Sequence, residues 1–315
     1  MNPLLTVVVP VYNRSHLIER TLDSIAASTY RPFVLKIVDN GSTDNSLEVC
    51  QRWAERNASA DGLVIEVLEE TKAGAPCARN CGLASCQTPY IYFFDSDDFC
   101  SPDFIGDVMR AFEKENADML FAPVQMEING KLKLRAYVEN GGLVEQIGSS
   151  MLSTHSMVFR TEWLRKIGGW REDLTVWQDW ELGIRALLAR PRILWMTTHP
   201  YHRVAIHGDS ITGSGLSQTL KGTLYATRCV IDEIRNADNI TDDEQSRCLL
   251  ALYYRSMITA GKLRREKNPE GDEAYRQLAA EILPNPNMLA KITGRLLYCY
   301  TAAGGRGAWK IIHNS

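Results

Sequence analysis

The sequence predicts an α/β protein with a parallel sheet covered by helices on both faces, followed by a helical C-terminal region. Between residues 6 and 94, short apolar β-branched runs alternate with stretches in which apolar residues recur at helical spacing. The connections between these segments are short, as is typical of parallel strands joined by helices. From Gln218 onward the pattern is helical, with breaks at two proline-containing segments. A ligand site is expected beyond the carboxyl ends of the strands of such a sheet.

Four strands and three helices are expected in the first third of the chain. The strands cover residues 6–11, 34–38, 63–67 and 90–94. The helices are indicated by Leu17, Ile18, Leu22 and Ile25, then by Leu47, Cys50 and Trp53, and then by residues 75–85. The fourth strand runs directly into an acidic cluster.

The middle of the chain departs from this alternation. Residues 101–103 read Ser-Pro-Asp, the order of an N-cap, a first-turn proline and a first-turn acid, so a helix is expected from there to Glu115. Asn129 and Gly130 separate two alternating runs and predict a β-hairpin. Short strands and helices are expected to mix from residue 150 to 212, including a strand over 201–206.

Composition excludes several classes of protein. The chain has 315 residues and a formal net charge of −3, which does not suit a nucleic-acid partner. The N-terminus lacks the cationic segment of a signal peptide, and no uncharged apolar stretch approaches the roughly 20 residues of a membrane-spanning helix. The eight cysteines form no C-x-x-C pair and are expected to be reduced thiols, so a cytoplasmic location is predicted.

The C-terminal segment is basic. Residues 285–315 contain Lys291, Arg295, Arg306 and Lys310 and no acidic residue, among many apolar and aromatic side chains. One interpretation is a peripheral contact with an anionic membrane surface, at the inner face of the plasma membrane. The other is an ordinary helix that packs its apolar face on the body of the protein.

The acidic cluster at residues 95–98 is the most informative local feature. In extended backbone, Asp95 and Asp97 point to the same side, while Ser96 and Asp98 turn away. Two convergent carboxylates repel each other unless a cation lies between them, and their oxygens suit Mg²⁺ or Mn²⁺. The alternative is that Asp97 or Asp98 only caps the turn before the next helix.

Seven short motifs carry a resemblance to a known family. They are Val7–Asn13 (VVVPVYN), Ile37–Asp44 (IVDNGSTD), Ala78–Leu83 (ARNCGL), Phe94–Asp98 (FDSDD), Gly168–Trp170 (GGW), Gln178–Glu181 (QDWE) and His207–Ile211 (HGDSI). In this order they resemble the family 2 inverting glycosyltransferases with the GT-A fold, of the bacterial surface-glycan type. The resemblance implies a Rossmann-like mixed sheet flanked by helices, with the C-terminal helices as an extension.

The resemblance implies a nucleotide site formed by the turns after the first two strands. Pro10, Tyr12 and Asn13 lie in the first turn, and Asp39 and Asn40 in the second. An acid in the second turn can accept the imide proton of uracil, and Asp39 is available for this role. Many relatives carry a second acid where this chain has Asn40, which leaves the identity of the base open.

The resemblance also implies a diphosphate and metal site. Arg79 faces the diphosphate in this family, and a guanidinium can bind phosphate oxygens bidentately. The metal, Mn²⁺ or Mg²⁺, is expected on Asp97 with help from Asp95, while Asp95 and Ser96 are also expected at the donor. His207 lies in a loop that closes over the pyrophosphate in relatives and is a third candidate metal ligand, with His202 as its competitor.

Asp179 is the expected general base. In the family the pattern usually reads Glu-Asp, with the Asp as base, and here Gln178 replaces the Glu. Glu181 could compete as base, but it is about 200° away from Asp179 around a helix. Trp177 and Trp180 offer faces on which a sugar ring can stack, or they pack in the core.

Together with the residues above, the resemblance implies an inverting, metal-dependent enzyme. It would move a hexosyl or N-acetylhexosaminyl unit from a nucleotide diphosphate sugar, with UDP as the expected nucleotide, to a hydroxyl of a glycan or lipid-linked acceptor. Residues 1–215 would form the GT-A domain, with 1–100 as its nucleotide-binding half and 101–215 as its acceptor half, and residues 216–315 the helical region. A noncatalytic nucleotide- or glycan-binding module is the alternative. A dinucleotide-dependent oxidoreductase is disfavoured because no G-x-G-x-x-G follows the first strand.

Overall fold

The computed structural model describes residues 2–58, 61–128, 130–205 and 215–312. The chain divides into two compact units, and each is described by itself. The first comprises Met1–Arg135, Leu152–Asp173 and Pro191–Ile206, and the second comprises Ala136–Met151, Leu174–Arg190 and His207–Ser315. Two internal segments therefore group with the C-terminal helices in the second unit. The predicted domain boundary at residue 215 stays a prediction.

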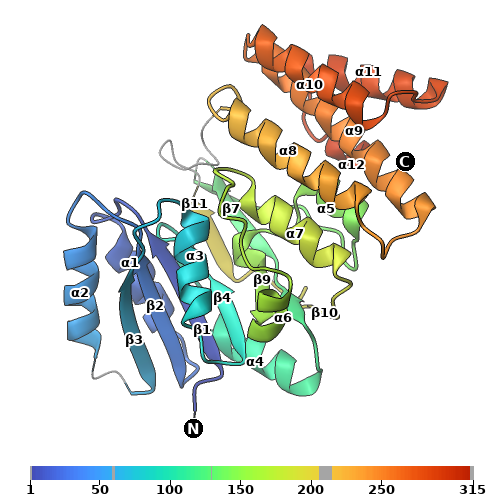
Figure 1. Ribbon diagram of the computed structural model, residues 1–315. Helices are drawn as coiled ribbons and strands as arrows, with labels where there is room; N and C mark the ends of the chain where they lie inside the picture. Colours follow the sequence, from blue (N-terminus) through green and yellow to red (C-terminus); the bar gives the residue numbers. More distant parts are fainter. Residues whose placement is uncertain (1, 59–60, 129, 206–214, 313–315) are drawn as a thin grey trace. The chain divides into compact units, whose positions relative to one another are not determined.

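The first unit contains a seven-stranded sheet in the order β10-β6-β9-β4-β1-β2-β3 (Figure 1). Its strands are β1 (Leu5–Val11), β2 (Phe33–Asp39), β3 (Leu63–Glu69), β4 (Tyr90–Phe93), β6 (Met119–Phe121), β9 (Met157–Arg160) and β10 (Ile193–Trp195). Strands β4, β1, β2 and β3 pair in parallel, as does β10 with β6. Strand β9 runs antiparallel to both of its neighbours, β4 and β6. The sheet is therefore mixed, as the family resemblance implied, and not wholly parallel.

Helices cover both faces of this sheet. They are α1 (Ile18–Ala26), α2 (Ser46–Asn57), α3 (Ala75–Ala84), α4 (Phe104–Lys114) and α6 (Thr161–Lys166). Alternate residues of β1, beginning with Leu5, share one core with the apolar faces of α1, α2 and α4. Val8 points to the opposite face, where α3 approaches so closely that a Cβ on Gly82 would lie 2.4 Å from Val8 Cγ1. Burial on both faces explains the continuous apolar run of β1.

A second, four-stranded sheet has the order β5-β11-β7-β8. Its strands are β5 (Phe99–Cys100), β7 (Val124–Ile128), β8 (Lys131–Leu134) and β11 (His202–Ala205), and a 3₁₀ turn, η1 (Thr154–Ser156), precedes β9. The pairing of β7 with β8 confirms the predicted hairpin. The N-cap of helix α4 is Asp103, two residues after the predicted N-cap Ser101, whose backbone N–H instead donates to Tyr201 O beside the β5–β11 pair.

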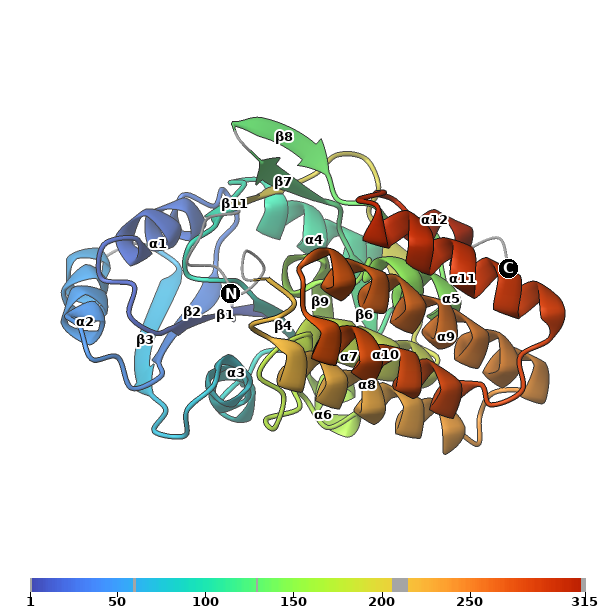
Figure 2. The ribbon, with the colours of Figure 1, turned by 90° about the horizontal axis from the view of Figure 1, so that it is seen from above.

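The second unit is helical. Its elements are α5 (Leu143–Ser149), α7 (Gln178–Leu188), α8 (Leu220–Arg235), α9 (Asp242–Arg265), α10 (Pro269–Ile282), α11 (Met288–Ala302) and α12 (Trp309–Ile312). Helices α8, α10 and α11 lie against α9, the longest (Figures 1 and 2). The Thr241 side chain caps α9 by accepting a hydrogen bond from the Glu244 backbone N–H. This unit confirms the predicted helical C-terminal region.

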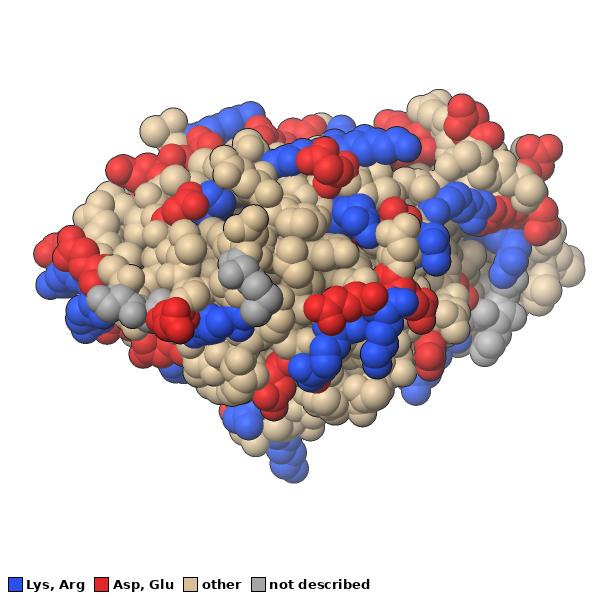
Figure 3. Space-filling model, turned by 90° about the horizontal axis from the view of Figure 1, so that it is seen from below, with Lys and Arg blue, Asp and Glu red and all other residues tan. Residues whose placement is uncertain are grey.

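Two surface properties bear on location and partners. Among the described helices, we find none that combines the length and the apolar character needed to cross a bilayer. Lysines and arginines are interspersed with acidic side chains over the face seen in Figure 3. On this face the charge is therefore mixed in sign.

Candidate active site

The loops after β1 and β2 are fastened to each other by Asn13. This residue has a left-handed backbone, with φ of 52°. Its Oδ1 accepts hydrogen bonds from the Thr43 backbone N–H at 2.8 Å and from the Asp44 backbone N–H at 3.3 Å. Asn13 tolerates this conformation better than most residues. The two turns predicted to hold a nucleotide therefore form one connected edge of the sheet.

Asp39 is the last residue of β2, and only one of its two carboxylate oxygens accepts a hydrogen bond within the described residues. Its Oδ2 accepts a hydrogen bond from the Ser42 backbone N–H at 3.0 Å. Its Oδ1 is buried and has no hydrogen-bond partner within the described residues. A buried acceptor without a partner is costly, so such an atom points to a donor supplied from outside the chain. The imide N–H of a uracil base would be such a donor.

Both polar atoms of the Asn40 side-chain amide form hydrogen bonds with the neighbouring loop. Its Nδ2 donates to the backbone oxygens of Glu70 and Lys72 at 3.0 and 2.8 Å, and its Oδ1 accepts from the Gly74 backbone N–H at 2.7 Å. Gly74 precedes α3, so Asn40 positions the start of that helix. Its predicted contact with a base stays a prediction.

The other residues predicted at the nucleotide are placed by backbone contacts. Pro10 lies within β1, in register with Val38 of β2, while Tyr12 follows the strand and is exposed. Ser96 is buried, and its backbone oxygen accepts a hydrogen bond from Thr21 Oγ1 at 3.0 Å. The exposed ring of Tyr12 is available for stacking on a base, whereas Ser96 is held in the loop that carries the acidic cluster.

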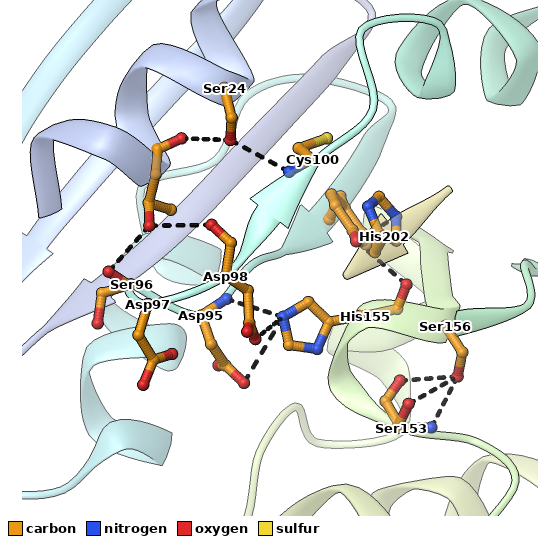
Figure 4. Close-up of polar contacts among 12 residues, drawn as sticks. Ser24, Asp95, Ser96, Asp97, Asp98, Cys100, Ser153, His155, Ser156 and His202 are labelled. Atoms are coloured by element: carbon orange, nitrogen blue, oxygen red, sulfur yellow. Dashed lines mark hydrogen bonds and ion pairs between the residues drawn. The ribbon is translucent and has the colours of Figure 1, made fainter. Parts of the chain in front are cut away.

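The acidic loop brings Asp95 and Asp98, not Asp95 and Asp97, to one side with His155 (Figure 4). One ligand atom from each of these three residues lies within 4.8 Å of the other two. The expectation of an extended backbone was wrong, because β4 ends at Phe93 and residues 96–97 form a turn. A turn places residues i and i+3 on one side.

Of the other predicted metal ligands, one lies beside the loop after β1 and the other is outside the described residues. Asp97 Oδ2 lies 3.8 Å from Arg14 Nε, in the loop after β1. His207 lies outside the described residues. The roles of both residues at a metal stay predictions, and Asp95 is the member of the predicted set that the cluster contains.

Strong electrostatic coupling characterises the cluster. His155 and Asp98 are buried, and His155 Nε2 lies 2.9 Å from Asp98 Oδ2 and 3.8 Å from Asp95 Oδ2. Burial alone would lower the pKa of His155, but the negative charges of Asp95 and Asp98 outweigh it and raise that pKa. Burial would raise the pKa of Asp95, but Arg79 and His155 outweigh it and lower that pKa. Asp95 is thus kept as a carboxylate that attracts cations.

Arg79 provides a cation on the other side of Asp95. Its guanidinium donates to Asp95 Oδ1 at 2.8 Å and lies over the Trp170 ring, 4.4 Å from its centroid. Asn80 accepts from the Trp170 backbone N–H at 2.9 Å, and a Cβ on Gly169 would lie 2.8 Å from Asn80 Oδ1. The motifs around Arg79 and Trp170 are therefore parts of one arrangement that presents a buried guanidinium beside the acidic loop.

Two histidines show what the sequence could and could not indicate. His202, considered as a competitor of His207, is buried, and its Nε2 is 2.9 Å from the Tyr92 hydroxyl. His155 was not among the site residues predicted from the sequence. It belongs to no motif, and only the antiparallel pairing of β9 with β4 brings it to the acidic loop.

Asp179 lies in the second unit, at the start of α7. Its Oδ1 accepts a hydrogen bond from the Trp180 backbone N–H at 2.9 Å. Trp177 precedes the helix in a left-handed conformation with φ of 57°, a strained backbone for an aromatic residue. Gln178, which replaces the usual Glu, donates to Leu174 O at 3.1 Å.

Glu181 is occupied by an ion pair within its own helix. Its side chain is 0% exposed, and its two carboxylate oxygens accept hydrogen bonds from the Arg185 guanidinium at 2.7 and 3.0 Å. Asp179, by contrast, is a partly exposed residue. Glu181 is therefore less available than Asp179 to accept a proton, and the role of Asp179 as base stays a prediction.

The two tryptophans beside Asp179 pack around Arg255 of α9. The Arg255 guanidinium lies 4.7 Å from the Trp177 ring centroid and 4.4 Å from that of Trp180, and it donates to Ile147 O at 2.8 Å. Trp180 is buried, so core packing explains it, whereas Trp177 is only partly buried. A helix outside the seven motifs thus supports the start of α7.

Comparison with known proteins gives the family. The family model for Glycosyl transferase family 2 matches residues 6–168. Glycosyltransferase GlyA of Streptococcus pneumoniae is 35% identical over 115 residues, which are 36% of this chain and 16% of that protein. The chain thus spans much less than two thirds of the length of this relative.

Two solved structures share the fold over nearly the whole chain. Staphylococcus aureus TarS in complex with UDP-GlcNAc matches with a TM-score of 0.72 and 19% identity, covering 99% of this chain and 90% of that one. The mannosyltransferase PcManGT from Pyrobaculum calidifontis, in complex with GDP-Man and Mn²⁺, matches with a TM-score of 0.62 and 19% identity, covering 100% and 86%. The chain belongs to glycosyl transferase family 2 and has the GT-A fold.

Proposed function

We propose that this chain is a glycosyltransferase that transfers a hexosyl or N-acetylhexosaminyl unit, with inversion, from a UDP-linked donor to a hydroxyl of a glycan or lipid-linked acceptor. The observation that carries the proposal is the cluster of Asp95, Asp98 and His155, with Arg79 on its other side, at the carboxyl end of β4. Such a combination of a cation site and a guanidinium can stabilise the negative charge on a nucleoside diphosphate leaving group.

The donor nucleotide would bind at the edge formed by the loops after β1 and β2. Asp39 Oδ1 would accept the imide proton of uracil, which supplies the partner that this buried atom lacks. Tyr12 would stack on the base. The UDP-GlcNAc in the TarS structure supports a UDP-linked donor. The PcManGT structure contains GDP-Man, so an experiment must distinguish uracil from guanine as the base.

The residues present fit a divalent metal. Two carboxylate oxygens and one imidazole nitrogen lie close enough together to bind one ion and leave positions open for phosphate oxygens. We propose Asp95, Asp98 and His155 as ligands, with Asp97 and His207 as the further candidates from the sequence. Mn²⁺ suits this mixed set, and the Mn²⁺ in the PcManGT structure supports it, with Mg²⁺ as the alternative. A bound metal would neutralise charge on the departing diphosphate.

The transfer itself would be one direct displacement. Asp179 would accept the proton of the acceptor hydroxyl while the hydroxyl oxygen attacks the anomeric carbon from the side opposite the diphosphate. The bond from the anomeric carbon to the diphosphate oxygen would break as the new glycosidic bond forms, so the configuration inverts. Arg79 would hold the diphosphate through its guanidinium.

The cellular setting follows from the acceptor class. A lipid-linked acceptor or growing surface glycan would locate the enzyme in the cytoplasm, at the inner face of the plasma membrane, with residues 285–315 as the segment in peripheral contact. The relationship to TarS, a poly(ribitol-phosphate) β-N-acetylglucosaminyltransferase, supports a role in polysaccharide biosynthesis.

A panel of nucleotide sugars tests the proposal. Binding of the correct donor with Mn²⁺ would raise the melting temperature, since a ligand specific for the native state stabilises it. UDP release from that donor would then be measured for the unsubstituted chain, for Asp179→Asn and for Asp232→Asn as a matched control on the exposed side of α8. We expect Asp179→Asn to lose turnover and keep donor binding, and Asp232→Asn to keep both. Full turnover in Asp179→Asn would remove the assignment of the base.

A further inference from the structure

Helix α11 packs on α9 through its small residues. The buried positions of α11 include Ala290, Gly294 and Thr301. A Cβ on Gly294 would lie 2.7 Å from the Tyr253 ring of α9, and a Cβ on Gly261 would lie 2.2 Å from Thr301 Oγ1. The two helices therefore approach each other too closely for larger side chains at these positions.

Leu297 of α11 is also buried, but five other large apolar side chains of the helix face outward. The exposed fractions are 77% for Met288, 72% for Leu289, 52% for Ile292, 64% for Leu296 and 49% for Tyr300. These five residues, named here the α11 outer face, lie within about 120° of arc on the helix and opposite the buried positions. A surface helix normally turns its apolar side to the core, whereas most of the large apolar residues of α11 lie on its exposed side. A contiguous apolar face of this kind marks a contact with another body.

Cations border the α11 outer face. Lys291 and Arg295 are exposed on the same helix, beside the arc of Met288 and Ile292. The loop after the helix is fastened to the face by a hydrogen bond of 2.9 Å from the Tyr300 hydroxyl to Arg306 O, and the Arg306 side chain is exposed. Residues 285–315 contain no acidic side chain.

We infer that the α11 outer face docks on an anionic lipid bilayer, with the helix lying in the plane of the interface. The apolar residues would enter the boundary between headgroups and acyl chains, and Lys291, Arg295 and Arg306 would meet lipid phosphates. Contact with a second copy of the same face is disfavoured, because it would bring cations together in a segment without acids to offset them. With 15 residues, the helix lies on the bilayer and does not cross it.

The inference rests on the proposed function in one respect: the proposed lipid-linked acceptor lies in a bilayer, and this would bring the enzyme to a membrane. Docking itself involves neither donor nor acceptor. It is therefore measured as vesicle binding in the absence of substrates, while UDP release is measured without vesicles. A failure of one then says nothing about the other.

Flotation of the full chain with vesicles tests the inference. The vesicles contain phosphatidylcholine alone, or equal amounts of phosphatidylcholine and phosphatidylglycerol. The apolar variant is Ile292→Asn with Leu296→Asn, and its matched control is Leu132→Asn with Leu134→Asn on β8, where both leucines are 46–47% exposed. The charge variant is Lys291→Gln with Arg295→Gln, and its control is Lys131→Gln with Lys133→Gln on the same exposed strand.

We expect the unsubstituted chain to bind the anionic vesicles and to be released by salt. The apolar variant should bind at least tenfold more weakly, because it loses roughly the free energy of transferring two aliphatic side chains from water into the membrane interface. The charge variant should lose about fivefold per cation removed, and only on anionic vesicles. Both controls should stay within about twofold of the unsubstituted chain.

Three results would overturn the inference. The first is an unsubstituted chain that does not bind anionic vesicles. The second is an apolar variant that binds as well as its control while circular dichroism shows the same melting curve. The third is a dimer in sedimentation experiments that dissociates in the apolar variant, without vesicle binding in any sample, which would assign the face to a second copy of the chain.

Discussion

His155 Nε2 lies 2.9 Å from Asp98 Oδ2, and both side chains are buried. The two residues come from separate segments, η1 and the loop after β4, and no motif in the sequence links them. Asp95 completes the group and is held as a carboxylate by Arg79. The candidate metal site is thus formed by tertiary packing around one recognisable acidic motif.

His155→Gln should weaken the response to Mn²⁺. The amide can still donate a hydrogen bond to Asp98, so the buried carboxylate keeps a partner, but one nitrogen ligand is lost. We expect the Mn²⁺ concentration for half-maximal UDP release to rise by about tenfold or more. The exposed His16→Gln is the control and should keep the original Mn²⁺ dependence. An unchanged Mn²⁺ dependence in His155→Gln would exclude this histidine from the site.

Asp39→Asn should weaken donor binding with little change in the maximal rate. The substitution preserves shape but replaces a buried carboxylate that has one oxygen without a partner. Losing a hydrogen bond to a charged acceptor costs about 1.5–3 kcal/mol, which corresponds to a rise in KM of about 10- to 150-fold. Steady-state kinetics with the nucleotide sugar measure this effect, with the exposed Asp61→Asn as control. If kcat falls while KM stays constant, Asp39 does not contact the base.

Glu181→Gln and Asp179→Asn should have opposite effects. Glu181 is fully buried and paired with Arg185, so its neutralisation should lower the free energy of unfolding by about 1–3 kcal/mol while the folded protein keeps its kcat. Asp179→Asn should lose turnover with little effect on stability. Denaturant titration and initial rates, corrected for the folded fraction, separate the two. The reverse pattern would make Glu181 the base.

His202 should make a contribution to stability that is lost in mild acid. Burial, followed by the charge of His155, lowers the pKa of His202 well below the ordinary 6.5. The unfolded chain binds a proton below about pH 6.5 that the folded His202 does not bind, so the free energy of unfolding decreases as pH falls, by up to about 1.4 kcal/mol per unit. His155 acts in the opposite sense, because its raised pKa stabilises the fold at low pH and this contribution is lost as pH rises.

The variant His202→Gln isolates this effect. It can keep a hydrogen bond to the Tyr92 hydroxyl but cannot titrate. Melting temperatures between about pH 7 and 5.5 should therefore fall less steeply in the variant than in the unsubstituted chain. Parallel slopes would show that His202 does not control the acid sensitivity.

Local sequence patterns were enough to predict much of the fold and part of the candidate site. The strands from β1 to β4 and the helices between them follow from apolar periodicity, because each buries a face dictated by its own residues. Asp39 and Asp95 were predicted from motifs at strand ends, and Arg79 from a motif on α3. The turn at residues 96–97 places Asp98, and not Asp97, on the same side as Asp95, since the end of a strand depends on its pairing. His155 depends on β9, whose antiparallel pairing with β4 is a long-range contact that no local pattern specifies.

Gly82 should tolerate no side chain while Val8 is present. A Cβ at this position would lie 2.4 and 2.8 Å from the two Val8 methyl carbons, both of which are buried between α3 and β1. Gly82→Ala should therefore destabilise the first unit by about 1–3 kcal/mol through overpacking. Val8→Ala removes those methyl groups, so the double variant should be more stable than the sum of the two single effects predicts. Urea titration of the four proteins gives the coupling energy. Additive effects would mean that α3 moves away from β1, and Arg79, which α3 carries, would then lose its position beside Asp95.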